Sequence, residues 1–235
     1  SVLKEIIGKI SFAMAQQDVR YYLNGLFLNF YKDEIFGVAT DGHRLAKAGV
    51  EFSNNVDEPI NAIVPRKGVI EIDKQLEEED QDIKIIISKN HMQVTSSFSE
   101  SVTKLIDGKF PDYERVIPSS PDKLINVECK VFKEALMRVS ILSNDRFRGV
   151  RLNFLENEIK VSANNPEKEE ASDDIKSQYI GEPLEVGFNV NYLIDVLNTI
   201  KTKNVQIALK DANSSALITP ENDSTASYVI MPLRL

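Results

Sequence analysis

The chain has 235 residues, 42% of them hydrophobic and 27% charged, which is enough for one large domain or two ordinary domains with hydrophobic cores. Its single cysteine, Cys129, and its two histidines, His43 and His91, exclude a disulfide framework and a cysteine-rich zinc site. No apolar run approaches the roughly 18 residues of a membrane span and no signal peptide is recognisable, so we expect a soluble cytoplasmic chain. The net charge of -8, if it is spread evenly, argues against a nucleic-acid partner.

The sequence contains an internal repeat at about half of its length, and a repeat of this kind dictates the architecture. The segment that begins at Leu3 aligns with the one that begins at Phe132, and residues 63–75 align with residues 187–199. The matches keep their order along the chain, which chance matches would not do. Each half is therefore predicted to contain the same series of elements.

Each copy opens with an amphipathic helix, whose apolar face carries Ile6, Ile7, Ile10 and Met14 in the first copy and Phe132, Leu136 and Val139 in the second. Aromatic and β-branched residues between polar turns predict strands at 21–30, 34–39, 83–88, 93–98, 150–155, 158–163, 205–209 and 215–218, with extended segments at 102–106 and 227–231. A second helix is predicted at 65–76, with a proline at its first position, and at 190–200, with Asn189 as its cap.

This order of elements predicts an α+β fold of two repeated domains, each with two helices packed on an antiparallel sheet. Two prolines and two serines make residues 117–122 the expected linker, so the domains are predicted at 1–117 and 118–235. Two acidic runs, at 77–82 and 167–174, interrupt the pattern. We interpret both runs as solvated loops.

The charge is not spread evenly. Each of the four helical segments has a net positive charge, namely 1–16, 63–76, 130–148 and 189–203. The strands and loops together therefore carry a net charge that is more negative than -8. If the helices share one side of the molecule, that side can face phosphates while the rest repels DNA. The other interpretation is that lysine and arginine simply favour helix surfaces.

Seven motifs, in order and across essentially the whole chain, resemble the bacterial sliding clamp family, the beta subunit of DNA polymerase III. They are Q-D-V-R-Y-Y-L-N-G (17–25), A-T-D-G-H-R-L-A (39–46), V-P-R-K-G-V-I-E (64–71), D-G-K-F-P-D-Y (107–113), F-R-G-V-R-L (147–152), G-F-N-V-N-Y-L-I-D-V-L (187–197) and Y-V-I-M-P-L-R-L (228–235). The resemblance implies the DNA clamp fold and a non-catalytic processivity factor that tethers the replicative polymerase to duplex DNA.

The family organisation implies a three-domain protomer that dimerises head to tail into a ring. The chain would hold the second and third domains, with the first clamp domain absent, which agrees with a start at Ser1 in a processed product or a piece of a longer chain. We therefore expect this fragment to be largely monomeric and unable to close the ring.

Carried over by position, the residues expected to face DNA are Gln17, Tyr21, Tyr22, Arg66 and Lys67. Weaker candidates, chosen from their helices and charge alone, are Lys4, Lys9 and Arg138. Contacts of this kind go to phosphates and carry no sequence information, which suits a ring that slides.

The family also has a groove that captures short linear peptides of the polymerase alpha subunit, the clamp loader and repair proteins. Its residues fall here on Leu23, Thr40, Gly42, His43, Arg44, Leu45, Pro111, Arg115, Val116, Asn189, Tyr192, Ser215, Val229, Met231, Pro232, Leu233, Arg234 and Leu235. Apolar side chains would form the floor, while His43 and the arginines would bind peptide carbonyls or an acidic side chain. Leu233 departs from the methionine expected in relatives, which keeps the volume but loses flexibility.

Other interpretations remain open at this point. Asp41 to Arg44 can be simply a tight turn and 231–235 a frayed edge strand. A repeat-built scaffold that binds proteins but not DNA is the alternative function. Asp41 and His43 as an acid–base pair lack a nucleophile and a phosphate loop, so we expect no enzyme, no cofactor and no zinc or calcium site.

Overall fold

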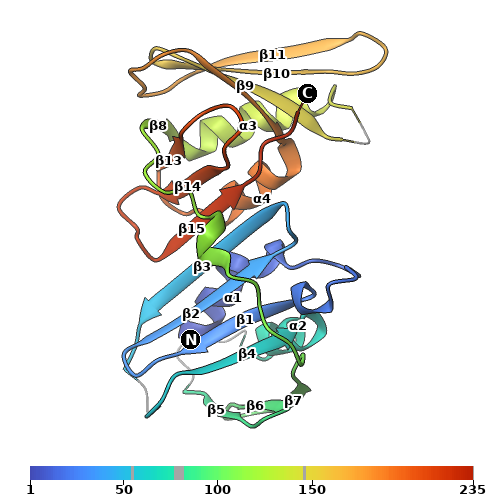
Figure 1. The fold of residues 1–235 in the computed structure, drawn as a ribbon, viewed down its shortest axis with the longest axis vertical. Coiled ribbons are helices and arrows are strands. Elements are labelled where there is room, and N and C mark those ends of the chain that lie inside the picture. The colour runs from blue at the N-terminus through green and yellow to red at the C-terminus, as the bar shows by residue number, and fades with distance from the viewer. Residues whose placement is uncertain (54–55, 77–81, 145–146, 235) are drawn as a thin grey trace. The chain divides into compact units, whose positions relative to one another are not determined.

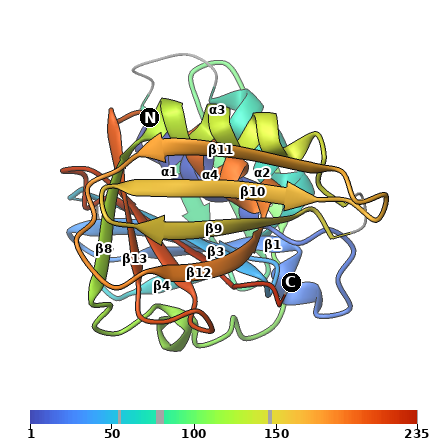
Figure 2. The ribbon, with the colours of Figure 1, turned by 90° about the horizontal axis from the view of Figure 1, so that it is seen from above.

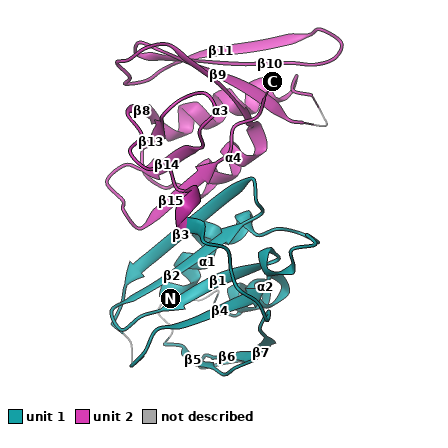
Figure 3. Cartoon of the chain, in the orientation of Figure 1, with its two compact units in different colours: residues 1–113 teal, residues 114–235 magenta. Residues whose placement is uncertain are grey.

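The computed structural model describes residues 1–53, 56–76, 82–144 and 147–234. The chain forms two compact units, Ser1–Tyr113 and Glu114–Leu235, coloured separately in Figure 3. No helix within the described ranges is long and apolar enough to cross a membrane.

Unit 1 combines two helices with two antiparallel sheets. Its elements are α1 (Val2–Ile10), β1 (Gly25–Phe30), β2 (Glu34–Thr40), β3 (Arg44–Glu51), β4 (Ile60–Pro65), α2 (Arg66–Gln75), β5 (Lys84–Ile87), β6 (His91–Thr95) and β7 (Glu100–Lys104) (Figure 1). The larger sheet has the order β4-β1-β2-β3 and the smaller one β5-β6-β7. Helix α1 packs on β2 and β3, and α2 packs on β1, β4 and β7, so the core lies between helices and strands.

Unit 2 repeats this plan. Its elements are β8 (Lys123–Glu128), α3 (Cys129–Ser140), β9 (Gly149–Leu155), β10 (Glu158–Asn164), β11 (Glu170–Lys176), β12 (Leu184–Asn189), α4 (Val190–Thr199), β13 (Asn204–Leu209), β14 (Ala216–Pro220) and β15 (Ala226–Ile230). Figure 2 shows β11, β10, β9 and β12 side by side in one sheet, and the second sheet orders β15, β14, β13 and β8. Helix α3 contacts strands of both sheets, and the two helices pack together.

The strand orders confirm the fold class predicted from the repeat. The order β4-β1-β2-β3 of unit 1 reappears as β12-β9-β10-β11 in unit 2, and β5-β6-β7 reappears as β13-β14-β15. The helix faces predicted from periodicity are also buried, because Ile6, Ile10, Phe132 and Leu136 are each fully enclosed. Unit 2 adds β8, which pairs with β13 from Asn204↔Glu128 to Leu209↔Lys123.

Helix ends follow local chemistry. The side chain of Asn189 accepts a hydrogen bond from Asn191 N, so it caps α4 as predicted. Pro65 was expected as the first residue of α2 but occupies the cap position instead, and the helix begins at Arg66. The reason is that Pro65 still pairs with Gly25 as the last residue of β4.

Two predicted elements are corrected. Residues 21–23 were expected in a strand but form a 3-10 turn, because Asn24 N and Leu23 N bond back to Tyr21 O and Arg20 O. The acidic run at 167–174 was expected to be a loop, yet its second half lies in β11 and pairs with β10. There the exposed Glu170 and Asp174 alternate with Ala171 and the buried Ile175, while Asp173, on the same face as Ile175, forms an ion pair with Arg138 of α3.

Several strands were not predicted, namely β3, β4, β8 and β12. The other acidic run, at 77–82, lies outside the described residues apart from Asp82. The expected linker at 117–122 has no helix or strand, and a 3-10 turn, Tyr113–Val116, precedes it.

Candidate functional site

The turn between β2 and β3, together with the strand ends Thr40 and Arg44, holds four of the residues predicted for the peptide groove and is fixed by its own side chains. Asp41 Oδ1 accepts hydrogen bonds from His43 N at 2.9 Å and from Arg44 N at 3.1 Å. The Thr40 hydroxyl accepts from Gly42 N at 3.1 Å and donates to Arg44 O at 2.6 Å. Gly42 has φ +88°, a left-handed conformation that favours glycine. His43 is exposed at the tip of this rigid turn.

Arg44 ties the turn to the end of the first helical segment. Its Nε lies 3.1 Å from Asp41 Oδ2, and its Nη2 donates to Phe12 O at 3.0 Å. The guanidinium carbon also lies 5.1 Å from the centre of the Phe12 ring, a cation–π distance. Both carboxylate oxygens of Asp41 are thus engaged in the turn, which argues against the acid–base pair of Asp41 and His43.

Arg20 also contacts this turn, and this contact was not predicted from the sequence. It forms an ion pair with Asp18 at 2.8 Å, and its Nη2 donates to Asp41 O at 3.4 Å. A Cβ atom on Gly42 would lie 2.8 Å from Arg20 Nη2, so the guanidinium packs directly on this glycine. The side-chain and backbone hydrogen bonds from Arg20 lower the pKa of Asp18 to about 2. Arg20 therefore connects the loop of Gln17 with the β2–β3 turn inside unit 1.

Several residues predicted for the groove floor are core residues. Leu23 and Leu45 in unit 1 are 2% and 3% exposed, and Val229 in unit 2 is 2% exposed. Pro111 in unit 1 and Arg115 and Val116 in unit 2 are exposed instead. Leu23, Leu45 and Val229 therefore belong to the cores of their own units.

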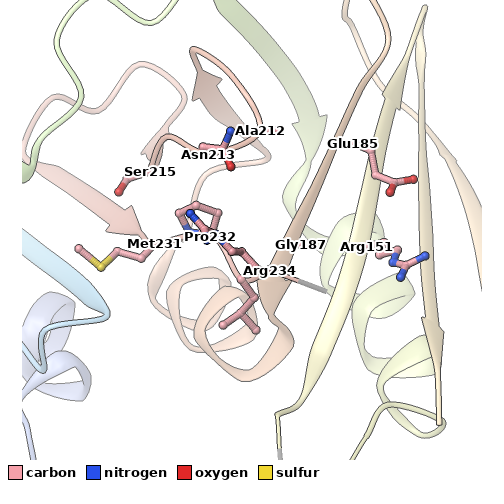
Figure 4. A pocket seen from close by; sticks show the side chains of 10 residues that line it. Arg151, Glu185, Gly187, Ala212, Asn213, Ser215, Met231, Pro232 and Arg234 are labelled. Atoms are coloured by element: carbon pink, nitrogen blue, oxygen red, sulfur yellow. The ribbon is translucent and has the colours of Figure 1, made fainter. Parts of the chain in front are cut away.

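Unit 2 has a pocket of about 460 Å³ that contains Ser215 and four residues of the C-terminal segment, Met231, Pro232, Leu233 and Arg234. All five belong to the predicted groove. Figure 4 shows Pro232 and Arg234 in the middle of the pocket, with Met231 at one end. Met231 is 41% exposed, so it offers apolar surface to a ligand. Asn189 and Tyr192 do not line this pocket, and Leu235 lies outside the described residues.

One backbone hydrogen bond sets the position of the C-terminal segment. Leu233 N donates to Gly187 O at 2.7 Å, and the two residues form a single antiparallel bridge beside β12. This contact holds Pro232 and Arg234 along the edge of the sheet. The wall of the pocket is thus built by main-chain pairing.

Five lining residues of the pocket were not predicted, namely Arg151, Glu185, Gly187, Ala212 and Asn213. Arg151 and Glu185 lie on different strands, and only the pairing of β9 with β12 brings them to one face. The alternation of exposed Arg151 with buried Val150 and Leu152 was readable in the sequence. It identified an outward side chain but not the pocket beside it.

The residues expected to face DNA lie on one loop and one helix start within unit 1. Gln17 and Lys67 are exposed, and the rings of Tyr21 and Tyr22 meet edge to face at 5.8 Å. Arg66 opens α2, and its Nη1 donates to Met14 O at 3.4 Å, next to the loop of Gln17. The first turn of α2 has no acidic residue, so basic side chains meet the positive end of the helix dipole there.

The weaker cationic candidates each have an acidic neighbour. Lys9 Nζ lies 2.8 Å from Glu5 Oε1, and Lys4 Nζ lies 3.9 Å from Asp73 Oδ1. Arg138 reaches from α3 to Asp173 on β11, with Nη2 and Oδ2 at 2.6 Å. These pairs reduce the local positive charge. Across the described ranges no group of three or more metal-ligating side chains comes together.

The arrangement of helices and antiparallel sheets, repeated twice, defines a protein of the clamp type, built from similar α+β domains. Residues 1–112 match the central domain of the DNA polymerase III beta subunit, and residues 114–234 match its C-terminal domain. The chain belongs to the DNA polymerase III beta subunit family.

Individual relatives agree with this assignment. The chain is 44% identical over 235 residues to a beta sliding clamp of Pseudomonas putida, covering all of this chain and 64% of the relative. A crystal structure of the Pseudomonas aeruginosa sliding clamp superposes with a TM-score of 0.97 at 45% identity, covering 99% of this chain and 64% of that one. A second P. aeruginosa clamp structure, bound to griselimycin, has a TM-score of 0.96. The chain thus spans 64% of the length of the relatives it matches.

Proposed function

We propose that the chain is the middle and C-terminal part of a DNA sliding clamp, a non-catalytic processivity factor of DNA polymerase III. The observation that carries this proposal is the match of its two consecutive units to two consecutive domains of that family. The full protein would be a ring-shaped homodimer that acts in the cytoplasm and tethers the polymerase to duplex DNA.

Two features of unit 1 support contact with DNA. The loop of Gln17, Tyr21 and Tyr22 lies beside the start of α2, where Arg66 and Lys67 supply positive charge. Such groups bind phosphate oxygens without reading bases, so the ring would slide along any sequence. The ion pairs of Lys4, Lys9 and Arg138 make these three cations weaker contributors.

The pocket of unit 2 supports the capture of linear peptides. An exposed Met231 beside Pro232 gives apolar contact, and Arg234 and Ser215 give polar partners. Within unit 1, the exposed His43 and the left-handed Gly42 of the β2–β3 turn stay candidates for peptide contact from the family resemblance alone. The P. aeruginosa clamp that binds griselimycin is consistent with a ligand-binding surface in the family.

The test is binding of a fluorescein-labelled peptide with the apolar pattern Q-L-x-L-F, measured by anisotropy. We expect a Kd in the micromolar range, about -8 kcal/mol, as is usual for short motifs. Met231→Ala should weaken binding about tenfold or more, because it removes the exposed apolar surface of the pocket. Met137→Ala is the matched control, since Met137 is 52% exposed on α3 and lines no part of the pocket.

Absence of binding to the unmutated chain, or equal loss in both variants, would refute the peptide site. Leu23→Ala is unsuitable for this test, because Leu23 is a core residue whose truncation destabilises the fold. The DNA proposal has a separate test on the full-length protein. After loading, it should remain on closed circular DNA and slide off linear DNA, and equal retention on both would contradict topological tethering.

A further inference from the structure

The pocket of unit 2 continues past the residues of the predicted groove into a charged arm. Figure 4 shows Arg151 and Glu185 together on neighbouring strands, at the end of the pocket opposite Met231. We define the charged arm as Arg151, Glu185 and Gly187. It lies on the sheet, whereas the groove residues lie on the C-terminal segment and the β13–β14 loop.

Strand pairing places the arm on one face. Arg151 on β9 is the register partner of Gly187 on β12, and Glu185 lies two residues before Gly187, so all three point to the same side of the sheet. Val150, Val186 and Phe188 point to the other side and are buried. Because Gly187 has no side chain, the surface between Arg151 and the C-terminal segment stays open.

The charges of the pocket favour an anionic group. Arg151 and Arg234 supply two positive charges against the single carboxylate of Glu185, and all three side chains are exposed. Within the described ranges no ion pair engages Arg151 or Glu185. A guanidinium that is not already paired can bind a carboxylate in a bidentate manner.

The opposite wall is pre-ordered. Asp211 Oδ1 accepts hydrogen bonds from Asn213 N at 2.8 Å and from the Ser214 hydroxyl at 2.9 Å, and these bonds lower the pKa of Asp211. The turn therefore presents Asn213 to the pocket in a fixed position. An amide at this place can bond to the main chain of an extended peptide.

We propose that the charged arm is a specificity subsite for an acidic residue that flanks the apolar motif of a bound peptide. This inference rests on the proposed peptide-binding function. Arg151 binds the acidic side chain, Asn213 holds the peptide main chain, and Glu185 disfavours a second acidic residue. Partners with the same apolar motif are thereby ranked by the charge beside it.

The test compares labelled peptides that share the Q-L-x-L-F pattern and carry Asp or Lys next to it, on either flank. The unmutated chain should bind the best Asp peptide about threefold more tightly than its Lys counterpart, as expected for an exposed ion pair. Arg151→Glu should reverse this preference. Glu185→Gln should increase the preference for the Asp peptide.

Lys160→Glu is the matched control, because Lys160 is exposed on β10, on the same face of the sheet as Arg151, and does not line the pocket. Reversal in Arg151→Glu with no change in Lys160→Glu supports the subsite. Equal effects in both variants, or no preference in the unmutated chain, would overturn it while peptide binding itself stands. If no peptide binds at all, the proposed groove fails, and the subsite fails with it.

Discussion

The hairpins β2–β3 and β10–β11 occupy equivalent places in the two units but carry different chemistry at their turns. In unit 1 the turn is short, and Asp41 and Arg44 bond it to itself and to Phe12. In unit 2 the loop is longer, and its hydrogen bonds stay within the loop: Asn165 Nδ2 and Glu169 Oε2 lie 2.6 Å apart, and Lys168 N donates to Asn165 O at 3.1 Å.

The two hairpins show that the paired strands determine the fold, whereas the turns carry the chemistry that differs between the units. The paired strands keep the same order in both units, while the turns carry the charges that face solvent. The first turn has His43 exposed and Arg20 packed beside it, and the second has the acidic residues Glu167 and Glu169. Binding chemistry is thus placed on the turns of a repeated scaffold, where it can diverge without a change of fold.

The largest effect should come from the residues that flank the two turns. Leu45, opposite Thr40, is 3% exposed, and Leu45→Ala should lower the free energy of unfolding by about 2–4 kcal/mol through a cavity. Glu170, opposite Asn164, is exposed, so Glu170→Ala should change the free energy of unfolding by less than about 0.5 kcal/mol. Urea denaturation measures both, and equal losses would contradict the comparison.

A smaller effect is expected from the turn acceptors themselves. Asp41→Ala removes the acceptor of two backbone N–H groups and the partner of Arg44, which should cost about 1–3 kcal/mol. Asn165→Ala removes exposed hydrogen bonds and should cost about 0.5 kcal/mol. Urea denaturation measures the free energy of unfolding lost in each of the two variants. A greater loss in Asn165→Ala than in Asp41→Ala would show that the second loop is the more rigid one.

Substitutions at two residues with left-handed backbone conformation, one in each turn, should change stability in opposite directions. Gly42 has φ +88°, so Gly42→Ala should destabilise unit 1 by about 1 kcal/mol and displace Arg20 from its contact. Lys168 in the other loop has φ 66°, so Lys168→Gly should be neutral or stabilising by about 0.5 kcal/mol. Thermal unfolding measures both changes, and a shift of the same sign in the two variants would contradict this prediction.

The smallest effect is the pH dependence that the Asp18–Arg20 pair gives to unit 1. Arg20 lowers the pKa of Asp18 to about 2 in the folded chain, below the ordinary value of about 3.9. The stability from this pair is therefore complete above about pH 4 and is lost as the pH falls toward 2. An NMR titration of the Asp18 carboxyl should give this low midpoint, and Arg20→Ala should raise it toward 3.9. An unchanged midpoint would exclude the ion pair as its cause.

The sequence predicted the repeat, the four helices and most hairpins because these depend on local periodicity. The cap at Asn189 followed from its side chain alone. Prediction from the sequence failed where strand pairing in the folded chain overrides the local sequence pattern, as in β11, whose acidic residues suggested a loop. Pairing with β10 and the burial of Ile175 stabilise that strand in spite of its charges.

The candidate sites were predicted through family resemblance, and the sequence alone gave no contacts between distant segments. The packing of Arg20 on Gly42 joins residues from two loops, and no spacing in the chain indicates it. Similarly, Arg151 and Glu185 meet only because β9 pairs with β12. Burial also changes the meaning of Leu23 and Val229, which were expected as a groove floor and lie in the cores.

The bond between Leu233 N and Gly187 O has a consequence for how this surface can change. This bond holds the segment of Pro232 and Arg234 through main-chain atoms, which a substitution of either side chain leaves in place. Substitutions at Pro232 and Arg234 can therefore change the peptide preference of the pocket without changing the backbone conformation of the segment. Because the main chain of this segment is fixed and its side chains can be exchanged, the pocket is a practical place to engineer new peptide preferences.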